Sequence, residues 1–223
     1  MGNGAIALKL LRTPKVLHRV IKSRISAHSK LNRCMSIPTR KINLMVLVVT
    51  RRCNMYCDFC MQDHDAHRQL ELNRIGLGDY RRVLDQAKIW NPTIQLTGGE
   101  PFIYPEIEEL INVIKEKNFF CIANTNGSTL KNHAKQLVEL GLEKIAISLD
   151  GPPEVHDHVR QFDNAYQLAE EGIRALANEK KRQGKNYPFI DVKSVINPTN
   201  TGYLEPIVKL AQTGLVQMVN FVH

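Results

Sequence analysis

Six short segments rich in apolar and β-branched residues recur along the chain, and segments with helical periodicity lie between them. Residues 43–50 (NLMVLVVT) form a continuous apolar run, which is typical of a strand buried on both faces. The other predicted strands are 93–97, 119–125, 144–149, 190–196 and 216–222, and the predicted helices are 79–90, 107–117, 131–140, 165–183 and 203–212. Strands that alternate with helices predict parallel strands joined by right-handed crossovers. This leaves two architectures, an open doubly wound sheet or a curved barrel.

The composition is that of a globular α/β protein, with 43% hydrophobic and 23% charged residues among 223. No run of 18 apolar residues occurs, so the sequence predicts no membrane span. No linker divides the body, which we take as residues 42–223. Because no helix follows the last predicted strand to cover its apolar side, we expect the sequence to lack a C-terminal part.

The positive charge is concentrated at the N-terminus. Residues 1–41 hold ten of the 30 Lys and Arg residues and none of the 22 Asp and Glu residues, which leaves the body slightly acidic. This argues against a nucleic-acid-binding body, where basic residues would follow the fold itself. Apolar residues at helical spacing predict a basic helical arm that packs on the body or contacts an anionic membrane surface. An acid-free arm also resembles an organelle transit peptide.

Three of the five cysteines lie within eight residues, as Cys53, Cys57 and Cys60 directly after the first strand. In parallel α/β folds, catalytic and binding residues lie in the loops at the carboxyl ends of the strands. An odd number of cysteines and such short loops disfavour disulfides, and favour a thiolate-bound metal in a reducing, cytoplasmic compartment. Three thiolates on a four-iron cluster would leave one iron free to bind a small molecule. Structural zinc, with His64 or His67 as the fourth ligand, is the alternative.

A second motif, Leu-Thr-Gly98-Gly99-Glu100-Pro101, closes the second predicted strand. Two glycines permit close approach to the backbone, and Glu100 offers a carboxylate to an ammonium group. The alternative is a simple turn in which the Glu100 carboxylate is solvated.

In this order and spacing, the two motifs resemble the radical S-adenosylmethionine (radical SAM) superfamily. Residues 124–127 and 148–160 also match, and the resemblance is greatest to the branch of sulfatase-maturing and peptide-modifying (SPASM-type) enzymes. It covers nearly all of residues 43–223. The resemblance implies a partial (β/α)6 TIM-like barrel of parallel strands, here preceded by the basic helical arm.

The resemblance also implies roles for individual residues. Cys53, Cys57 and Cys60 would hold a [4Fe–4S] cluster. The implied SAM contacts are Phe59, Gly99, Glu100, Ser148 and Arg160. Strand parity places Asn124 and Asn126 on one face, where they would meet the substrate, and Lys193 is a further candidate. We interpret His156, Asp157 and His158 as loop residues rather than metal ligands, and Cys121 as a core residue.

The implied activity is reductive cleavage of SAM, followed by hydrogen abstraction from an unidentified substrate, for which the branch suggests a peptide. Such an enzyme needs an electron donor of the flavodoxin or ferredoxin kind. The alternative is a non-catalytic binding module of the same fold, stabilised by zinc or by the cluster.

Overall fold

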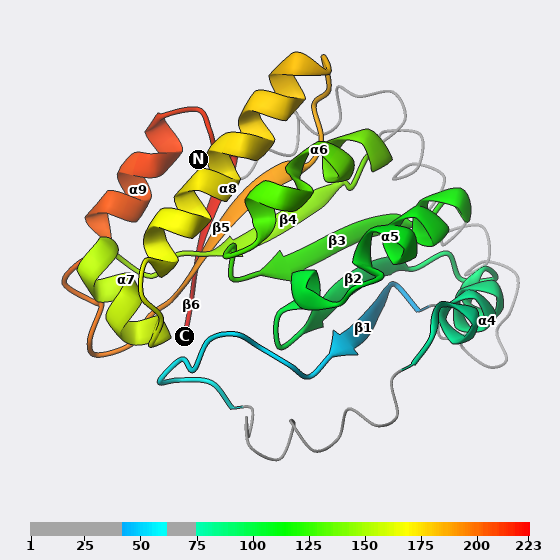
Figure 1. Cartoon of the computed structure of the whole chain (residues 1–223), viewed down its shortest axis with the longest axis horizontal. Helices are drawn as coiled ribbons and strands as arrows, with labels where there is room; N and C mark the ends of the chain where they lie inside the picture. Colours follow the sequence, from blue (N-terminus) through cyan, green and yellow to red (C-terminus); the bar gives the residue numbers. More distant parts are fainter. Residues whose placement is uncertain (1–41, 62–74) are drawn as a thin grey trace, which may run out of the picture. The chain divides into compact units, whose positions relative to one another are not determined.

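The computed structural model describes residues 42–61 and 75–223. Its six strands form one parallel sheet in the order β1-β2-β3-β4-β5-β6 (Figure 1). The strands are β1 (Leu44–Thr50), β2 (Thr93–Gly98), β3 (Phe120–Thr125), β4 (Lys144–Ser148), β5 (Phe189–Val195) and β6 (Met218–Val222). All six predicted strands are confirmed to within two residues. The sheet is open, in the α/β arrangement of a partial barrel, as predicted.

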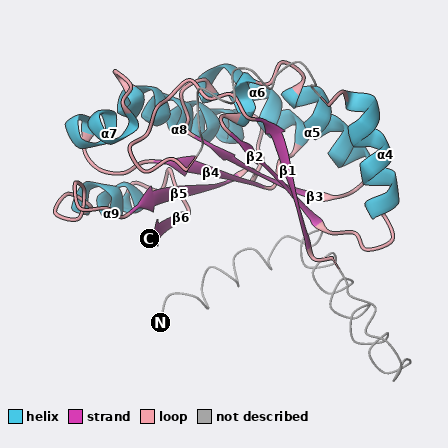
Figure 2. Cartoon of the chain, turned by 90° about the horizontal axis from the view of Figure 1, so that it is seen from below, coloured by secondary structure: helices cyan, strands magenta, loops and turns pink. Residues whose placement is uncertain are grey.

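Six α-helices and one 3₁₀ turn connect the strands in the described residues. They are α4 (Leu77–Ala87), η2 (Pro101–Ile103), α5 (Ile107–Glu116), α6 (Leu130–Leu140), α7 (Pro153–Arg160), α8 (Ala165–Arg182) and α9 (Glu205–Gln212). Helices α4 to α8 lie along one face of the sheet (Figure 2). The five predicted helices are confirmed, with ends that differ by up to three residues.

Helix α7 corrects one prediction, because it contains His156, Asp157 and His158, which the sequence analysis placed in a loop. The run Gly151-Pro152-Pro153 looks like a turn. Pro153, however, occupies the first helical position, where a proline needs no hydrogen-bond donor and its fixed φ suits the helix. An eight-residue helix also shows too few periods to be recognised from its pattern.

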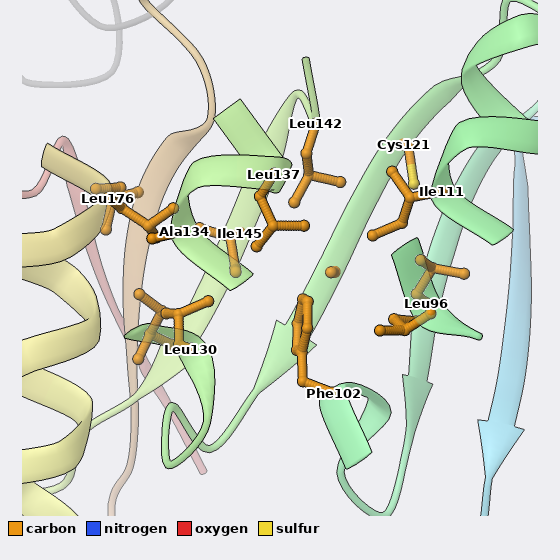
Figure 3. Packing of buried hydrophobic residues seen from close by; sticks show 14 of the residues in the cluster. Leu96, Phe102, Ile111, Cys121, Leu130, Ala134, Leu137, Leu142, Ile145 and Leu176 are labelled. Carbon is orange, nitrogen blue, oxygen red and sulfur yellow. The ribbon is translucent and has the colours of Figure 1, made fainter. Parts of the chain in front are cut away.

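The core lies between the helices and the face of the sheet that they cover (Figure 3). Alternate strand residues such as Leu96, Cys121 and Ile145 point to this side and are fully buried. Leu137 of α6 and Ile111 of α5 pack in the same cluster. The prediction that Cys121 is a core residue is confirmed.

The opposite face of β1 is exposed. Leu44, Val46 and Val48 retain about half of their accessible surface, at 48%, 49% and 52%. The prediction that this strand is buried on both faces is therefore wrong for one face. Because β1 is an edge strand of an open sheet, its helix-facing side packs in the core while its other side faces solvent.

The basic arm, residues 1–41, and the two histidines considered as zinc ligands, His64 and His67, lie outside the described residues. Across the two described ranges, no helix combines the length and the apolar character that crossing a membrane requires.

Candidate active site

The cysteine loop follows β1 and is fixed to the end of β2 by backbone hydrogen bonds. The amide of Gly99 donates to the Thr50 carbonyl at 2.9 Å, and the amide of Glu100 donates to the Arg52 carbonyl at 2.8 Å. A Cβ atom at Gly98 would lie 2.1 Å from the Thr50 oxygen, and one at Gly99 would lie 1.9 Å from the Arg52 oxygen. Both positions therefore require glycine, because the cysteine loop itself approaches so closely.

The far side of the cysteine loop is held by α7, toward which it runs from β1 in Figure 1. The amides of Tyr56 and Asp58 donate to the carbonyls of Arg160 and Val159, at 3.3 and 3.1 Å. Met55, between the first two cysteines, is fully buried. The end of β2, helix α7 and the buried Met55 side chain therefore hold the loop in place, which restricts the positions of the three thiols.

One cavity at the carboxyl edge of the sheet collects the predicted site residues. It is lined by Cys53, Cys57, Cys60, Phe59, Gly99, Asn124, Asn126, Ser148 and Arg160, and also by Met55, Thr97, Gly98, Pro101 and Thr125. Of the residues predicted from the sequence for the cluster, SAM and the substrate, Glu100 and the further candidate Lys193 are not part of this lining. In the second group, Gly98 and Pro101 belong to the predicted glycine motif, whereas Met55 and Thr125 were not predicted as site residues.

The three thiols differ in their surroundings. Burial raises the pKa of both Cys53 and Cys57, and the nearby Arg160 charge offsets part of the effect at Cys57. Cys53 accepts contacts from the Met55 amide at 3.5 Å and the Asn126 Nδ2 at 3.8 Å, whereas Cys57 accepts from Arg160 Nη1 at 3.6 Å. Cys60 is exposed. Binding a cationic metal group would deprotonate these thiols and release protons.

The thiols fit a group held by three thiolates, because all three open into one cavity and two have hydrogen-bond donors beside them. Within the described ranges, no three His, Cys, Asp or Glu side chains are arranged to hold a single metal ion.

Arg160 forms the wall of the cavity beside Cys57. Its Nε and Nη2 donate to Asp150 Oδ2 at 2.7 and 2.6 Å, and its guanidinium carbon lies 5.1 Å from the centre of the Phe59 ring. Burial alone would raise the pKa of Asp150, but contact with His156 and the charge of Arg160 hold it below its usual value. Strand parity places Asp150 on the same face as Ser148, the predicted SAM contact, and predicts that its carboxylate is either paired or lines a cavity. The structure shows it paired with Arg160 and outside the lining.

Glu100 is fully buried, so the alternative of a solvated turn carboxylate is wrong. Its Oε1 accepts from the Phe102 amide at 3.0 Å and the Thr125 hydroxyl at 2.7 Å, and its Oε2 accepts from the Asn126 amide at 2.6 Å. Burial raises the pKa of Glu100, and these hydrogen bonds offset part of the increase. The carboxylate joins the ends of β2 and β3, and its contact with SAM stays a prediction.

The two asparagines predicted to face the substrate differ. The Asn126 side chain donates to Asn54 Oδ1 at 2.9 Å and accepts from the Ser128 hydroxyl at 2.7 Å, so it supports the cysteine loop. Asn124 is partly exposed on the cavity wall. A substrate contact stays a prediction for both. The partners Asn54 and Ser128 are 74 residues apart, and no local pattern reveals such a contact.

The profile of the Radical SAM superfamily matches residues 47–194. The AdoMet-dependent heme synthase of Oleidesulfovibrio alaskensis is 27% identical over 201 residues, which cover 87% of this chain and 50% of the relative. The GTP 3′,8-cyclase of Clostridium acetobutylicum is 35% identical over 115 residues, which cover 50% of this chain and 36% of the relative. The chain spans about half the length of the first curated relatives.

Two solved structures share the fold. SuiB of Streptococcus suis bound to its precursor peptide SuiA has a TM-score of 0.66 and 18% identity, over 93% of this chain and 44% of SuiB. The anSMEcpe structure with AdoMet and a peptide has a TM-score of 0.65 and 17% identity, over 82% of this chain and 51% of that one. The predicted partial-barrel fold is confirmed by these similarities.

Proposed function

The chain belongs to the radical SAM superfamily, whose members use a [4Fe–4S] cluster and SAM, and from this premise we propose that it cleaves SAM reductively to start a radical reaction. The cluster would be held by Cys53, Cys57 and Cys60. The observation that carries the proposal is that the three thiols open into the same cavity as Ser148 and Arg160. Electron transfer from the cluster to SAM requires that the two sites be in contact.

When bound, the reduced cluster supplies an electron that splits SAM into methionine and a 5′-deoxyadenosyl radical able to take hydrogen from a C–H bond. The chain supplies three thiolates, and the described residues that line the cavity include no histidine to complete the ligand set. Arg160 retains N–H groups beyond those bound to Asp150 and Cys57, and its planar fork suits the SAM carboxylate. Phe59 offers a ring to the adenine, and Ser148 a hydroxyl.

For the substrate, the proposal is a peptide. Its support is the shared fold with SuiB and anSMEcpe, both with structures that contain a peptide. Sequence relatives named for heme and GTP chemistry favour other substrates, so family membership does not select one. Asn124 and Lys193 are the polar groups that we propose to meet the substrate. Lys193 pairs in register with Ser148, so it lies on the cavity face of β5.

Two further parts of the proposal concern partners and location. The reaction needs one electron per turnover, which we propose comes from a flavodoxin- or ferredoxin-like donor in the cytoplasm. Peripheral membrane contact through residues 1–41 stays a prediction about residues outside the described ranges. The non-catalytic module remains the alternative function.

The test is anaerobic reconstitution with iron and sulfide, followed by dithionite and SAM, with 5′-deoxyadenosine measured by liquid chromatography. We expect a brown protein that forms 5′-deoxyadenosine and methionine. The matched control is the Cys57→Ala chain, which should form neither. A colourless zinc protein would favour the non-catalytic module. A chain that holds the cluster and binds SAM without forming 5′-deoxyadenosine would contradict the proposed activity.

A further inference from the structure

Asp150 lies directly behind the cavity wall and is fully buried. It follows β4 and does not line the cavity, whereas its partner Arg160 does. The Asp150 Oδ2 atom accepts both the Nε and Nη2 groups of Arg160, at 2.7 and 2.6 Å. A carboxylate bound to two donors of one guanidinium fixes the plane as well as the position of that group.

Asp150 is itself fixed from the neighbouring strand and turn. Its Oδ1 accepts from the Val195 amide at the end of β5, at 2.8 Å. Its backbone carbonyl accepts from Asn200 Nδ2 at 2.9 Å, and its amide donates to His156 Nδ1 at 3.0 Å. The position of this carboxylate is therefore determined by β4, β5 and α7 together, with no freedom left to the side chain.

The fixed guanidinium is aimed at the cysteine loop. With Nε and Nη2 turned to Asp150, the remaining nitrogen, Nη1, lies 3.6 Å from Cys57 Sγ. The guanidinium carbon also lies over the Phe59 ring, 5.1 Å from its centre. His156 does not compete as a cation, because burial lowers its pKa and keeps it neutral. Arg160 is thus the positive group that Asp150 presents to the cluster site.

We propose that Asp150 is a positioning residue, which holds Arg160 against Cys57 so that the guanidinium donates to the cluster thiolate and meets the SAM carboxylate. A donor and positive charge beside a cluster thiolate favour the reduced cluster, since reduction adds negative charge. Asp150 thereby acts on the midpoint potential and on SAM affinity through Arg160. This inference rests on the proposed function.

The sign of the potential shift separates this role from a simple charge effect. If Asp150 acted only as a negative charge, its neutralisation with Arg160 still in place would make the cluster easier to reduce. If it acts by holding Arg160, the Asp150→Asn change weakens that hold, because the amide removes the negative charge and places an N–H against either the guanidinium or the Val195 amide. The cluster then loses its donor and becomes harder to reduce.

The experiment measures the midpoint potential by EPR-monitored redox titration, and SAM affinity by calorimetry, on the full reconstituted chain. The variants are Asp150→Asn, Arg160→Gln and the double variant. The control is Asp157→Asn, the same change in a carboxylate of α7 that accepts the Asn164 and Tyr166 amides instead. We expect a more negative potential and about tenfold or greater loss of SAM affinity for Asp150→Asn, with no change for Asp157→Asn.

The double variant completes the test. If Asp150 acts through Arg160, the double variant should match Arg160→Gln alone within about twofold in SAM affinity. The proposal would be overturned if the losses of SAM affinity in the two single variants multiplied in the double variant. It would also be overturned if the midpoint potential of Asp150→Asn were unchanged or more positive. If Asp150→Asn does not fold, Arg160→Lys carries the test, because lysine keeps the charge but cannot reach Asp150 and Cys57 together. Wild-type potential and affinity in that variant would also overturn it. A wild-type chain without cluster or SAM binding would refute the proposed function instead.

Discussion

Buried carboxylates have different partners at the two ends of the parallel strands, which we call the amino edge and the carboxyl edge of the sheet. Near the amino edge, Glu143 forms an ion pair with Lys115 and accepts the Cys121 amide at 2.8 Å. Asp191 pairs with Lys144 at 2.5 Å. These carboxylates have lysine partners, and neither lines the candidate site.

At the carboxyl edge, the partners of the carboxylates themselves reach the cysteines. Glu100 accepts the amide of Asn126, whose side chain extends to Cys53, and Asp150 holds Arg160 against Cys57. Burial and hydrogen bonding alone therefore do not distinguish a structural carboxylate from a functional one. What separates them is the partner of each carboxylate, which is a lysine outside the candidate site at one edge and a residue that contacts a cysteine thiol at the other.

The largest expected contrast is between two cysteines. Cys57→Ala should abolish the cluster, because two thiolates cannot replace three in so short a loop. Cys121→Ala, which changes a fully buried cysteine near the amino edge, should leave the cluster intact. Iron and sulfide analysis after reconstitution measures both. Retention of about four irons per chain in Cys57→Ala would contradict the assignment of the ligands.

The next contrast compares Glu100→Gln with Glu143→Gln. Each variant leaves buried donors poorly satisfied, so each should lower the free energy of unfolding by about 1–3 kcal/mol, measured in urea. Only Glu100→Gln should also reduce SAM affinity, by about tenfold, because it disturbs the end of β3 beside the cavity. Equal SAM affinity in the two variants would show that the two edges do not differ in function.

The pH dependence of the Asp150 ion pair gives a smaller effect. Its pKa is lowered in the folded chain, so its stabilisation is complete above the unfolded pKa and is lost as pH falls through the folded pKa. The difference in unfolding free energy between the wild-type and Asp150→Asn chains, both without cluster, should therefore shrink below about pH 4. Urea denaturation at several acidic pH values measures it. If the difference in unfolding free energy between the two chains grew on acidification, the pKa of Asp150 would be raised by folding rather than lowered.

The smallest contrast is between two serines on adjacent strands. Ser148→Ala should weaken SAM binding by about two- to tenfold, the effect of one hydrogen bond, without changing stability. Ser194 is fully buried, and its hydroxyl has no hydrogen-bond partner in the described part of the chain. Ser194→Ala should leave SAM affinity unchanged and stability equal or higher. Calorimetry and thermal unfolding test the pair, and equal SAM affinities would remove Ser148 from the site.

Local sequence pattern was sufficient for the strands and the cysteine motif, and insufficient for the contacts that support them. A run such as NLMVLVVT identifies its strand, yet nothing in it shows that β1 lies at an open edge. Glu100 stood out as a carboxylate beside two glycines. Its partners Thr125 and Asn126 lie 25 and 26 residues away, across a strand pair. Helix α7 was missed because its first residues resemble a turn, and with it the docking of the cysteine loop.

EPR spectroscopy of the reduced, reconstituted chain tests whether the carboxyl edge of the sheet holds a cluster with one iron open to SAM. We expect the signal of a reduced [4Fe–4S] cluster whose g values change when SAM is added, because SAM would bind the iron that lacks a protein ligand. A signal that SAM leaves unchanged, or a protein that takes up zinc and shows no cluster signal, would contradict it.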